Sequence, residues 1–251
     1  MKPVFICVVT AFLIWSAVPD TTRFGPGGAF QLEYSNVDDF GLQAHGVIEH
    51  LDAYGRTKSY PLPQSTFESY AKLRPEGLKL NPLAATGGNY ERNEVIGPHQ
   101  MEGGRLWFGN NFYDGEGERG VGVFGYFDTA TRQYTLFSPP EVAAYEVSSI
   151  LVERDIVWVA LDHSGEDIST FPGGLVRWNR TTHQLRRYPI EFVVSNVARE
   201  GASLRLTTHD GYALLTGEEI HRFRVTTKAN GTTETAAISQ FPPPPSTHFQ
   251  P

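Results

Sequence analysis

Two acidic, glycine-containing loops lie at matching places in this chain and have the residue types that bind a hard metal ion. One loop contains Asp114 and Glu116, and the other contains Asp162 and Asp167. Glu116 and Asp167 are 51 positions apart. Ca²⁺ and Mg²⁺ bind through several oxygen ligands, which carboxylates and loop carbonyls supply. The pattern therefore predicts a cation site formed by these four carboxylates. The alternative is that both loops are simply solvated.

Two histidines near the same segments are candidates for acid–base chemistry. His99 precedes one predicted strand, and His163 follows the matching strand 51 residues later. Histidine is the side chain whose ordinary pKa lies closest to neutral pH. We therefore take His99 and His163 as candidate catalytic residues, against the alternative that both are ordinary loop residues. The sequence has no Gly-x-Ser-x-Gly, no phosphate-binding glycine loop and no His-Glu-x-x-His.

The elements that would position these residues follow a period of 51 positions. The matching pairs are Trp107 and Trp158, Phe127 and Trp178, Asp128 and Asn179, Thr131 and Thr182, Gln133 and Gln184, and Phe137 and Tyr188. Strand-rich units that recur every 40–50 residues, roughly, are typical of β-propeller blades. Both tryptophans fall in apolar strands, which favours core packing over stacking on sugars.

Alternating apolar segments within each unit predict strands separated by tight turns. A partial earlier copy covers residues 46–60, and a degenerate later copy covers residues 204–238. We therefore predict an all-β domain over residues 24–240, a β-propeller or propeller-like fold with about four to five blades of antiparallel strands. A strand at 29–34 would close the ring by completing the last blade.

Residues 64–104 interrupt this pattern. Residues 65–73 have weak helical periodicity, and proline and glycine break the segment that follows. The region holds either the inner strand of the second blade or a blade too divergent to recognise. We expect any functional site in this segment or in the acidic loops at 110–122 and 161–174.

Charge and composition limit the class of partner. The chain has 251 residues and a formal net charge of −7, which argues against a nucleic-acid partner, since such proteins need a basic surface. The hydrophobic content of 40% supports a packed core.

The two ends of the chain differ from the rest. Residues 4–18 are uncharged and mostly apolar and follow Lys2, which predicts a signal peptide over residues 1–18 and a secreted or periplasmic protein. An uncleaved N-terminal membrane anchor is the alternative. Cys7, the only cysteine, lies in this segment, so a cleaved chain would have no disulfide and no thiolate nucleophile. The proline-rich residues 241–251 predict a flexible tail.

Short motifs resemble known propeller families. Gly97-Pro98-His99, followed by Gly104 and by Trp107-Phe108, is similar to a unit of the virginiamycin B (streptogramin) lyase family. The segment also resembles the propeller repeats of two-component regulators, and the similarity is best over residues 97–140. The resemblance implies a ring-shaped, exported, ligand-facing scaffold. That family forms a seven-bladed ring, for which this chain is too short, and none of its catalytic residues can be matched here.

These observations lead to two hypotheses about function. The first is a binding or sensing module that holds a small molecule or a protein through loops on one face of the ring. The second is a lyase or hydrolase of the streptogramin-lyase type, with histidine and carboxylate side chains and a divalent cation. A third, weaker hypothesis is that the chain completes its ring as a homo-oligomer.

Overall fold

Four antiparallel sheets follow one another along the chain and make this an all-β protein. The structure, a computed structural model, describes residues 22–36, 44–62, 93–113, 119–143, 145–164, 170–228 and 231–238. Within these ranges the helical elements are the 3-10 turn η1 (Pro26–Gly28) and the single turn α3 (Pro140–Ala143). The prediction of an all-β fold is confirmed.

Each sheet is a meander in which neighbouring strands are consecutive in sequence. The first sheet consists of β1 (Thr22–Phe24), β2 (Phe30–Asn36), β3 (Ala44–Leu51) and β4 (Thr57–Tyr60). The second consists of β5 (Asn93–Glu102), β6 (Arg105–Tyr113), β7 (Arg119–Asp128) and β8 (Gln133–Phe137). The third consists of β9 (Glu146–Val152), β10 (Ile156–Ser164), β11 (Thr170–Asn179) and β12 (Leu185–Tyr188). The fourth consists of β13 (Asn196–Glu200), β14 (Ser203–Thr208), β15 (Gly211–Thr216), β16 (Glu219–Thr227) and β17 (Thr233–Ile238).

The second and third sheets match each other at the spacing seen in the sequence. β6 and β10 begin and end 51 residues apart, and so do β7 and β11. The strand register matches too, because Trp107 lies opposite Tyr126, and Trp158 lies opposite Arg177. The turns after β7 and β11 are also alike. The side chain of Asp128 accepts hydrogen bonds from the main-chain N–H groups of Ala130 and Thr131. The side chain of Asn179 accepts the equivalent bonds from Thr181 and Thr182.

Apolar side chains fill the three spaces between consecutive sheets. Phe30, Leu32, Ile48, Leu106 and Phe127 lie between the first and second sheets. Trp107, Phe124, Val157, Val176 and Trp178 lie between the second and third. Trp158, Leu175, Tyr188, Val197 and Leu206 lie between the third and fourth. Each large apolar side chain buried in this way contributes roughly 1.5–3 kcal/mol to folding.

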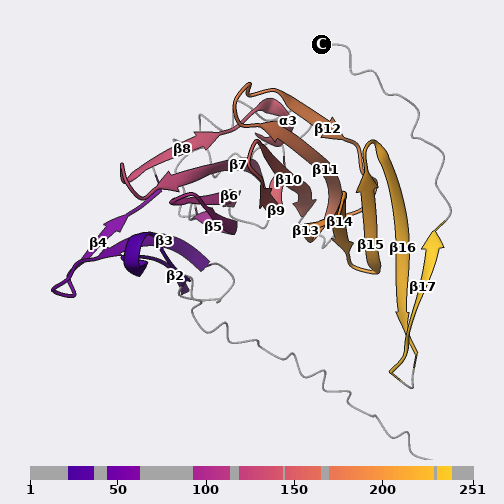
Figure 1. Cartoon of the computed structure of the whole chain (residues 1–251), viewed down its shortest axis with the longest axis horizontal. Coiled ribbons are helices and arrows are strands. Elements are labelled where there is room, and N and C mark those ends of the chain that lie inside the picture. The colour runs from indigo at the N-terminus through magenta and orange to yellow at the C-terminus, as the bar shows by residue number, and fades with distance from the viewer. Residues whose placement is uncertain are drawn as a thin grey trace, which may run out of the picture.

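The sheets are arranged in an open arc (Figure 1). Among the described residues, no strand pairing joins the first sheet to the fourth. The expected closure by residues 29–34 is wrong, because β2 pairs with β1 and β3 inside the first sheet. That sheet provides partners for β2 on both sides, and the last sheet has its own outer strand, β17.

The structure describes part of the irregular segment 64–104. The inner strand of the second sheet exists as β5, which contains Gly97, Pro98 and His99. The predicted helix at 65–73, the signal peptide and the tail lie outside the described residues. No helix in the described ranges is long and apolar enough to span a membrane.

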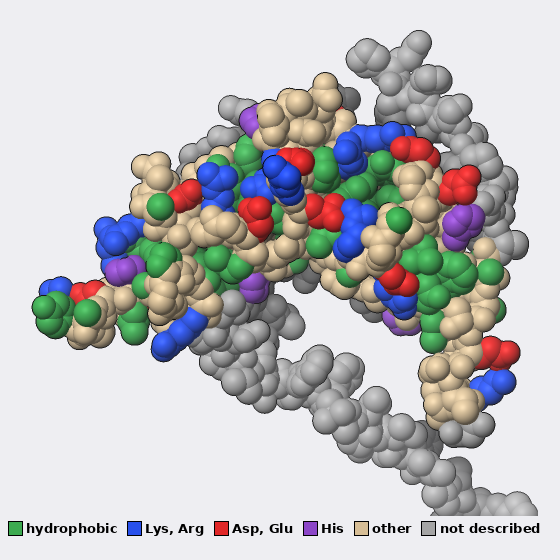
Figure 2. Space-filling model, viewed as in Figure 1, with side chains coloured by type: hydrophobic (Ala, Val, Ile, Leu, Met, Phe, Trp, Pro, Cys, Tyr) green, Lys and Arg blue, Asp and Glu red, His purple; other side chains and the backbone are tan. Residues whose placement is uncertain are grey.

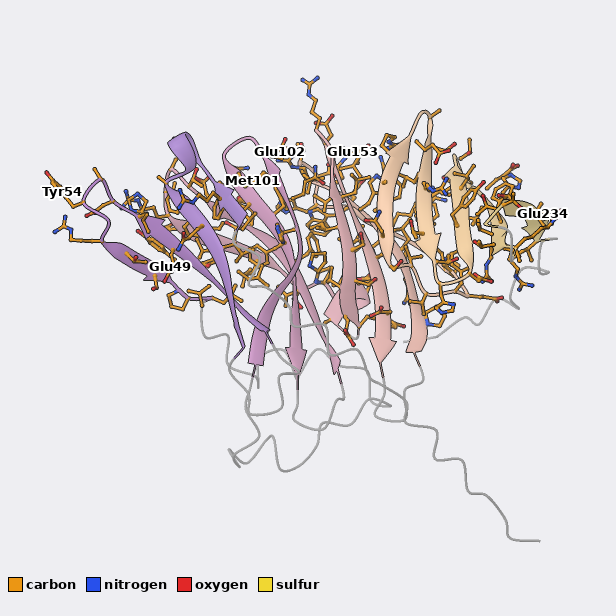
Figure 3. All side chains as sticks on the ribbon, turned by 90° about the horizontal axis from the view of Figure 1, so that it is seen from below. Glu49, Tyr54, Met101, Glu102, Glu153 and Glu234 are labelled. Atoms are coloured by element: carbon orange, nitrogen blue, oxygen red, sulfur yellow. The ribbon has the colours of Figure 1, made fainter. Side chains whose placement is uncertain are left out.

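Six tight connections lie at one end of the strands, which we call the turn end. They are the β5–β6, β7–β8, β9–β10, β11–β12, β13–β14 and β15–β16 connections. Figure 3 shows Glu102 and Glu153 near this rim, at the ends of β5 and β9. The predicted acidic loops connect β6 to β7 and β10 to β11 at the opposite end.

Candidate functional site

The predicted cation site falls largely outside the described residues. Asp114, Glu116 and Asp167 are not described, whereas Asp162 lies on β10, where it pairs in register with Glu146 of β9. Glu146 is 3% exposed and was missed by the sequence analysis. Residues directly opposite in an antiparallel pair share a face, so the sheet brings these two carboxylates together. Within the described residues, no group of three or more potential metal ligands occurs. The cation site therefore stays a prediction.

The predicted catalytic histidines lie on strands of different sheets. His99 is on β5, opposite Phe108, and its Nδ1 lies 3.3 Å from the carbonyl oxygen of Gly97. His163 is on β10, opposite Phe171 in the third sheet, and its side chain is not described. No geometry on the described residues joins the two into an acid–base pair, and their catalytic role also stays a prediction.

The turn end carries ion pairs that recur between sheets. Arg180 donates two hydrogen bonds of 3.0 Å to the carboxylate of Glu102, and its guanidinium lies 4.9 Å from the ring centroid of Trp107. Glu153, 51 positions after Glu102, accepts hydrogen bonds from Arg199 at 2.7 and 2.6 Å and from Trp158 Nε1 at 3.0 Å. We call the pairs Glu102–Arg180 and Glu153–Arg199 clamps. Each clamp joins a carboxylate of one sheet to an arginine of the next. Figure 2 shows such basic and acidic side chains lying together along the arc.

These clamps set the charge states of their members. The bond from Arg180 holds the pKa of Glu102 below its ordinary value, and the bond from Arg199 does the same for Glu153. Reciprocally, Glu153 raises the pKa of Arg199. Both carboxylates are therefore ionised at neutral pH, and Arg199 is fully engaged by its partner.

A pocket of about 400 Å³ opens beside the second clamp, between the third and fourth sheets. We call it the arginine pocket. The third sheet lines it with Trp158, Arg177, Arg186 and Tyr188. The fourth sheet lines it with Arg199, Leu204, Leu215 and Glu218, and with the turn residues Ala202 and Gly217. Volumes of roughly 300–1,000 Å³ are typical of small-molecule sites.

Three residues of the pocket form one row across the third sheet. Trp158 lies opposite Arg177, and Arg177 lies opposite Arg186. The next row on this face consists of Ala160, Leu175 and Tyr188, which belong to the core. The row therefore places two guanidinium groups side by side at the edge of an apolar interface.

The countercharges of this row are unequal. Arg186 forms an ion pair with Glu218 of the β15–β16 turn, and the two side chains are 56% and 58% exposed. Arg177 forms no hydrogen bond or ion pair with a described residue. Its guanidinium lies 6.0 Å from the ring centroid of Trp158, and its charge helps to lower the pKa of Glu153. Among the described residues, Arg177 thus has no directly bonded countercharge, and Glu153 acts on it only at longer range.

The same row in the second sheet is neutral. The residues 51 positions earlier are Trp107, Tyr126 and Thr135, which lie in the same register. At the rim beyond this row, Arg105 and Asp128 form an ion pair, whereas the corresponding residues of the third sheet are Ile156 and Asn179. On the face of the third sheet that packs against the fourth sheet, Arg177 and Arg186 therefore take the places that neutral residues hold in the second sheet.

The sequence did not predict this pocket. The predicted sites were the irregular segment 64–104 and the acidic loops, whereas residues of the 51-residue pattern line the pocket at the turn end, opposite the acidic loops. One signal was present in the sequence: the pattern keeps a tryptophan at Trp107 and Trp158 but has Arg177 in place of Tyr126 and Arg186 in place of Thr135.

No protein-family model matches the chain, and a search of curated proteins finds no match.

Proposed function

We propose that this protein is an exported binding module with a β-propeller-type scaffold, and that it binds a small molecule in the arginine pocket. The scaffold part rests on consecutive four-stranded meanders that pack face to face with a common register. Antiparallel meanders of this kind are the units of propellers. Its export rests on the apolar N-terminal segment, and identification of the mature N-terminus by mass spectrometry tests it.

The observation that supports binding is the location of the pocket. The 51-residue pattern fills the space between the second and third sheets with Trp107, Tyr126 and an arginine clamp. Between the third and fourth sheets the pattern changes, and a cavity of about 400 Å³ remains beside charged and aromatic side chains. Pockets that combine an apolar wall with a few polar groups are the usual form of a small-molecule site.

The experiment is a ligand screen by thermal shift with compounds of both charges and of none, followed by a variant that fills the pocket. Ala202 is an exposed turn residue that lines the pocket, so Ala202→Trp adds bulk there without opening the core. Ala130→Trp is the control, because Ala130 is an exposed turn residue at the same end of the second sheet. We expect ligands that bind the wild type and the Ala130→Trp protein to lose binding in Ala202→Trp. Equal binding to all three proteins would disprove the site.

The lyase alternative lacks support of this kind. The described contact of His99 is with the carbonyl oxygen of Gly97, and no histidine is among the described residues that line the arginine pocket. The proposed homo-oligomer is tested by light scattering on the purified chain, with a dimeric or larger mass as the expected result.

A further inference from the structure

We infer that the ligand of the arginine pocket carries an oxyanion, a carboxylate or a phosphate group, attached to a small apolar body. This inference rests on the proposed binding function. The oxyanion lies between Arg177 and Arg186 and replaces Glu218 as the partner of Arg186.

The first support is the cross-strand pair of arginines. Arg177 and Arg186 occupy directly opposite positions on β11 and β12, and like charges at such positions destabilise a sheet. Glu218 compensates one of the two charges. An oxyanion between the two guanidinium groups replaces Glu218, lies close to both charges and removes this repulsion. Binding of an oxyanion is thus favoured by a charge imbalance that the folded protein already contains.

The second support is the chemistry of the guanidinium group. Arginine presents several N–H donors in a plane that matches the geometry of a carboxylate or a phosphate. Arg199 is occupied by both oxygens of Glu153, so it forms a wall of the pocket and is not a ligand contact. The two remaining arginines are the groups available to an anion.

The third support is the weakness of the pair between Arg186 and Glu218. Both side chains are more than half exposed, and exposed ion pairs contribute little to stability. Glu218 lies in the β15–β16 turn of the opposite sheet, so it can leave Arg186 without disturbing the strands of the third sheet. It acts as an internal competitor that a ligand anion displaces.

The apolar part of the ligand follows from the remaining walls. Leu204 and Leu215 line the pocket from the fourth sheet, and Trp158 and Tyr188, each 7% exposed, line it from the third. These four side chains are between 1% and 7% exposed, so little of their surface remains to be buried. A small aromatic or aliphatic body contacts their exposed edges, and the anion supplies most of the binding free energy.

The test is isothermal titration of the full chain with benzoate and phenyl phosphate, and with benzyl alcohol and benzylamine as neutral and cationic controls of similar size. Inorganic phosphate measures what the anion contributes alone. We expect benzoate or phenyl phosphate to bind about tenfold or more tightly than the neutral and cationic controls, and this affinity to fall as salt is added.

Three variants assign the binding to the named residues. Arg177→Gln should weaken the binding of the anionic probe by about tenfold or more, and Arg177→Lys, which keeps the charge but not the planar donors, by less. Glu218→Gln should strengthen it by a few-fold, roughly, because the competitor loses its charge. Arg154→Gln is the matched control: it removes one exposed arginine at the same end of the sheets, outside the pocket, and should leave the affinity unchanged.

The outcomes separate the two proposals. Benzyl alcohol binding as tightly as benzoate, with binding lost in Ala202→Trp, overturns the oxyanion inference and leaves the binding function standing. Anion binding that is unaffected by Arg177→Gln and Glu218→Gln, in proteins whose thermal unfolding matches the wild type, overturns the inference too. If no probe binds at millimolar concentration, both proposals fail.

Discussion

The side-chain amide of Gln100 and the main chain of Val152 are joined by two hydrogen bonds across the space between the second and third sheets. Oε1 accepts from the Val152 N–H at 2.8 Å, and Nε2 donates to the Val152 carbonyl at 2.9 Å. The amide thus imitates a neighbouring strand for a residue at the end of β9. In the third sheet the corresponding residue is Leu151, which packs at the edge of the next core and forms no such link.

Replacement of Gln100 should destabilise the protein. Gln100→Leu keeps the volume but leaves the N–H and C=O of Val152 without these partners, which costs about 1–3 kcal/mol. Urea unfolding measures the change. Gln133→Ala, at an exposed position of β8, is the control and should have an effect below about 0.5 kcal/mol. An equal effect of the two substitutions would mean that the Gln100 bonds contribute nothing.

Asp210 should give the protein a pH-dependent contribution to stability. A hydrogen bond from Arg222 at 2.8 Å is the main cause that lowers the pKa of Asp210 from 3.8 to about 2, and Thr208 and Arg224 add to it. The folded pKa is lower than the unfolded one, so the ionised carboxylate stabilises the fold above about pH 4. This contribution disappears as the pH falls towards 2.

The measurement compares Asp210→Asn with the wild type by urea unfolding from pH 7 to pH 2. We expect the variant to be less stable at pH 7 and the difference to shrink below pH 4. A difference that stays constant down to pH 2 would contradict the assignment, because it would show that the charge of Asp210 is not what stabilises the fold.

Two matching turn residues should respond differently to glycine. Arg132 and His183 have positive φ values of 59° and 56°, which glycine adopts with less strain. Arg132→Gly should therefore stabilise the protein by about 0.5–1 kcal/mol. His183 also stacks on Trp178, with ring centroids 5.3 Å apart, so His183→Gly loses an aromatic contact worth a similar amount.

Thermal unfolding of both variants tests this difference. The melting temperature should rise for Arg132→Gly and should not rise for His183→Gly. His183→Asn serves as the control, since asparagine tolerates the left-handed region but cannot stack. A higher melting temperature for His183→Gly than for Arg132→Gly would show that the stacking is unimportant.

Gly109 should not tolerate a side chain. A Cβ atom there would overlap Cγ1 of Val147, which alanine lacks, and would lie 2.6 Å from its Cβ, where β6 of the second sheet meets β9 of the third. Gly109→Ala should therefore destabilise the protein by about 1–3 kcal/mol through overcrowding. The double variant with Val147→Ala should recover part of that loss. Strictly additive effects in urea unfolding would indicate that the two positions do not meet.

The cation hypothesis for the acidic loops has its own test. It predicts that millimolar Ca²⁺ or Mg²⁺ raises the melting temperature and that Asp162→Asn reduces the shift, because a bound ion stabilises the folded state. Glu218→Gln, at the opposite end of the strands, is the control and should leave the shift intact. An unchanged melting temperature in both salts would remove the hypothesis.

The sequence predicted the strands well where the 51-residue pattern is strong. The later copy expected over residues 204–238 coincides with β14 to β17, and the earlier copy expected over 46–60 coincides with parts of β3 and β4. The pattern works because aromatic residues and turn formers mark each strand locally. The prediction failed for β2, because an isolated apolar strand does not show in its sequence which sheet it joins.

By itself, the sequence determined the all-β character and, where the 51-residue pattern is strong, the turn positions, because these depend on residues close together along the chain. Only the tertiary structure decided that Trp158, Arg177 and Arg186 form one row, and that this row faces Leu204, Leu215 and Glu218 of another sheet. The register across three strands and the packing of one sheet on the next bring together residues up to 60 positions apart. That long-range packing creates the arginine pocket.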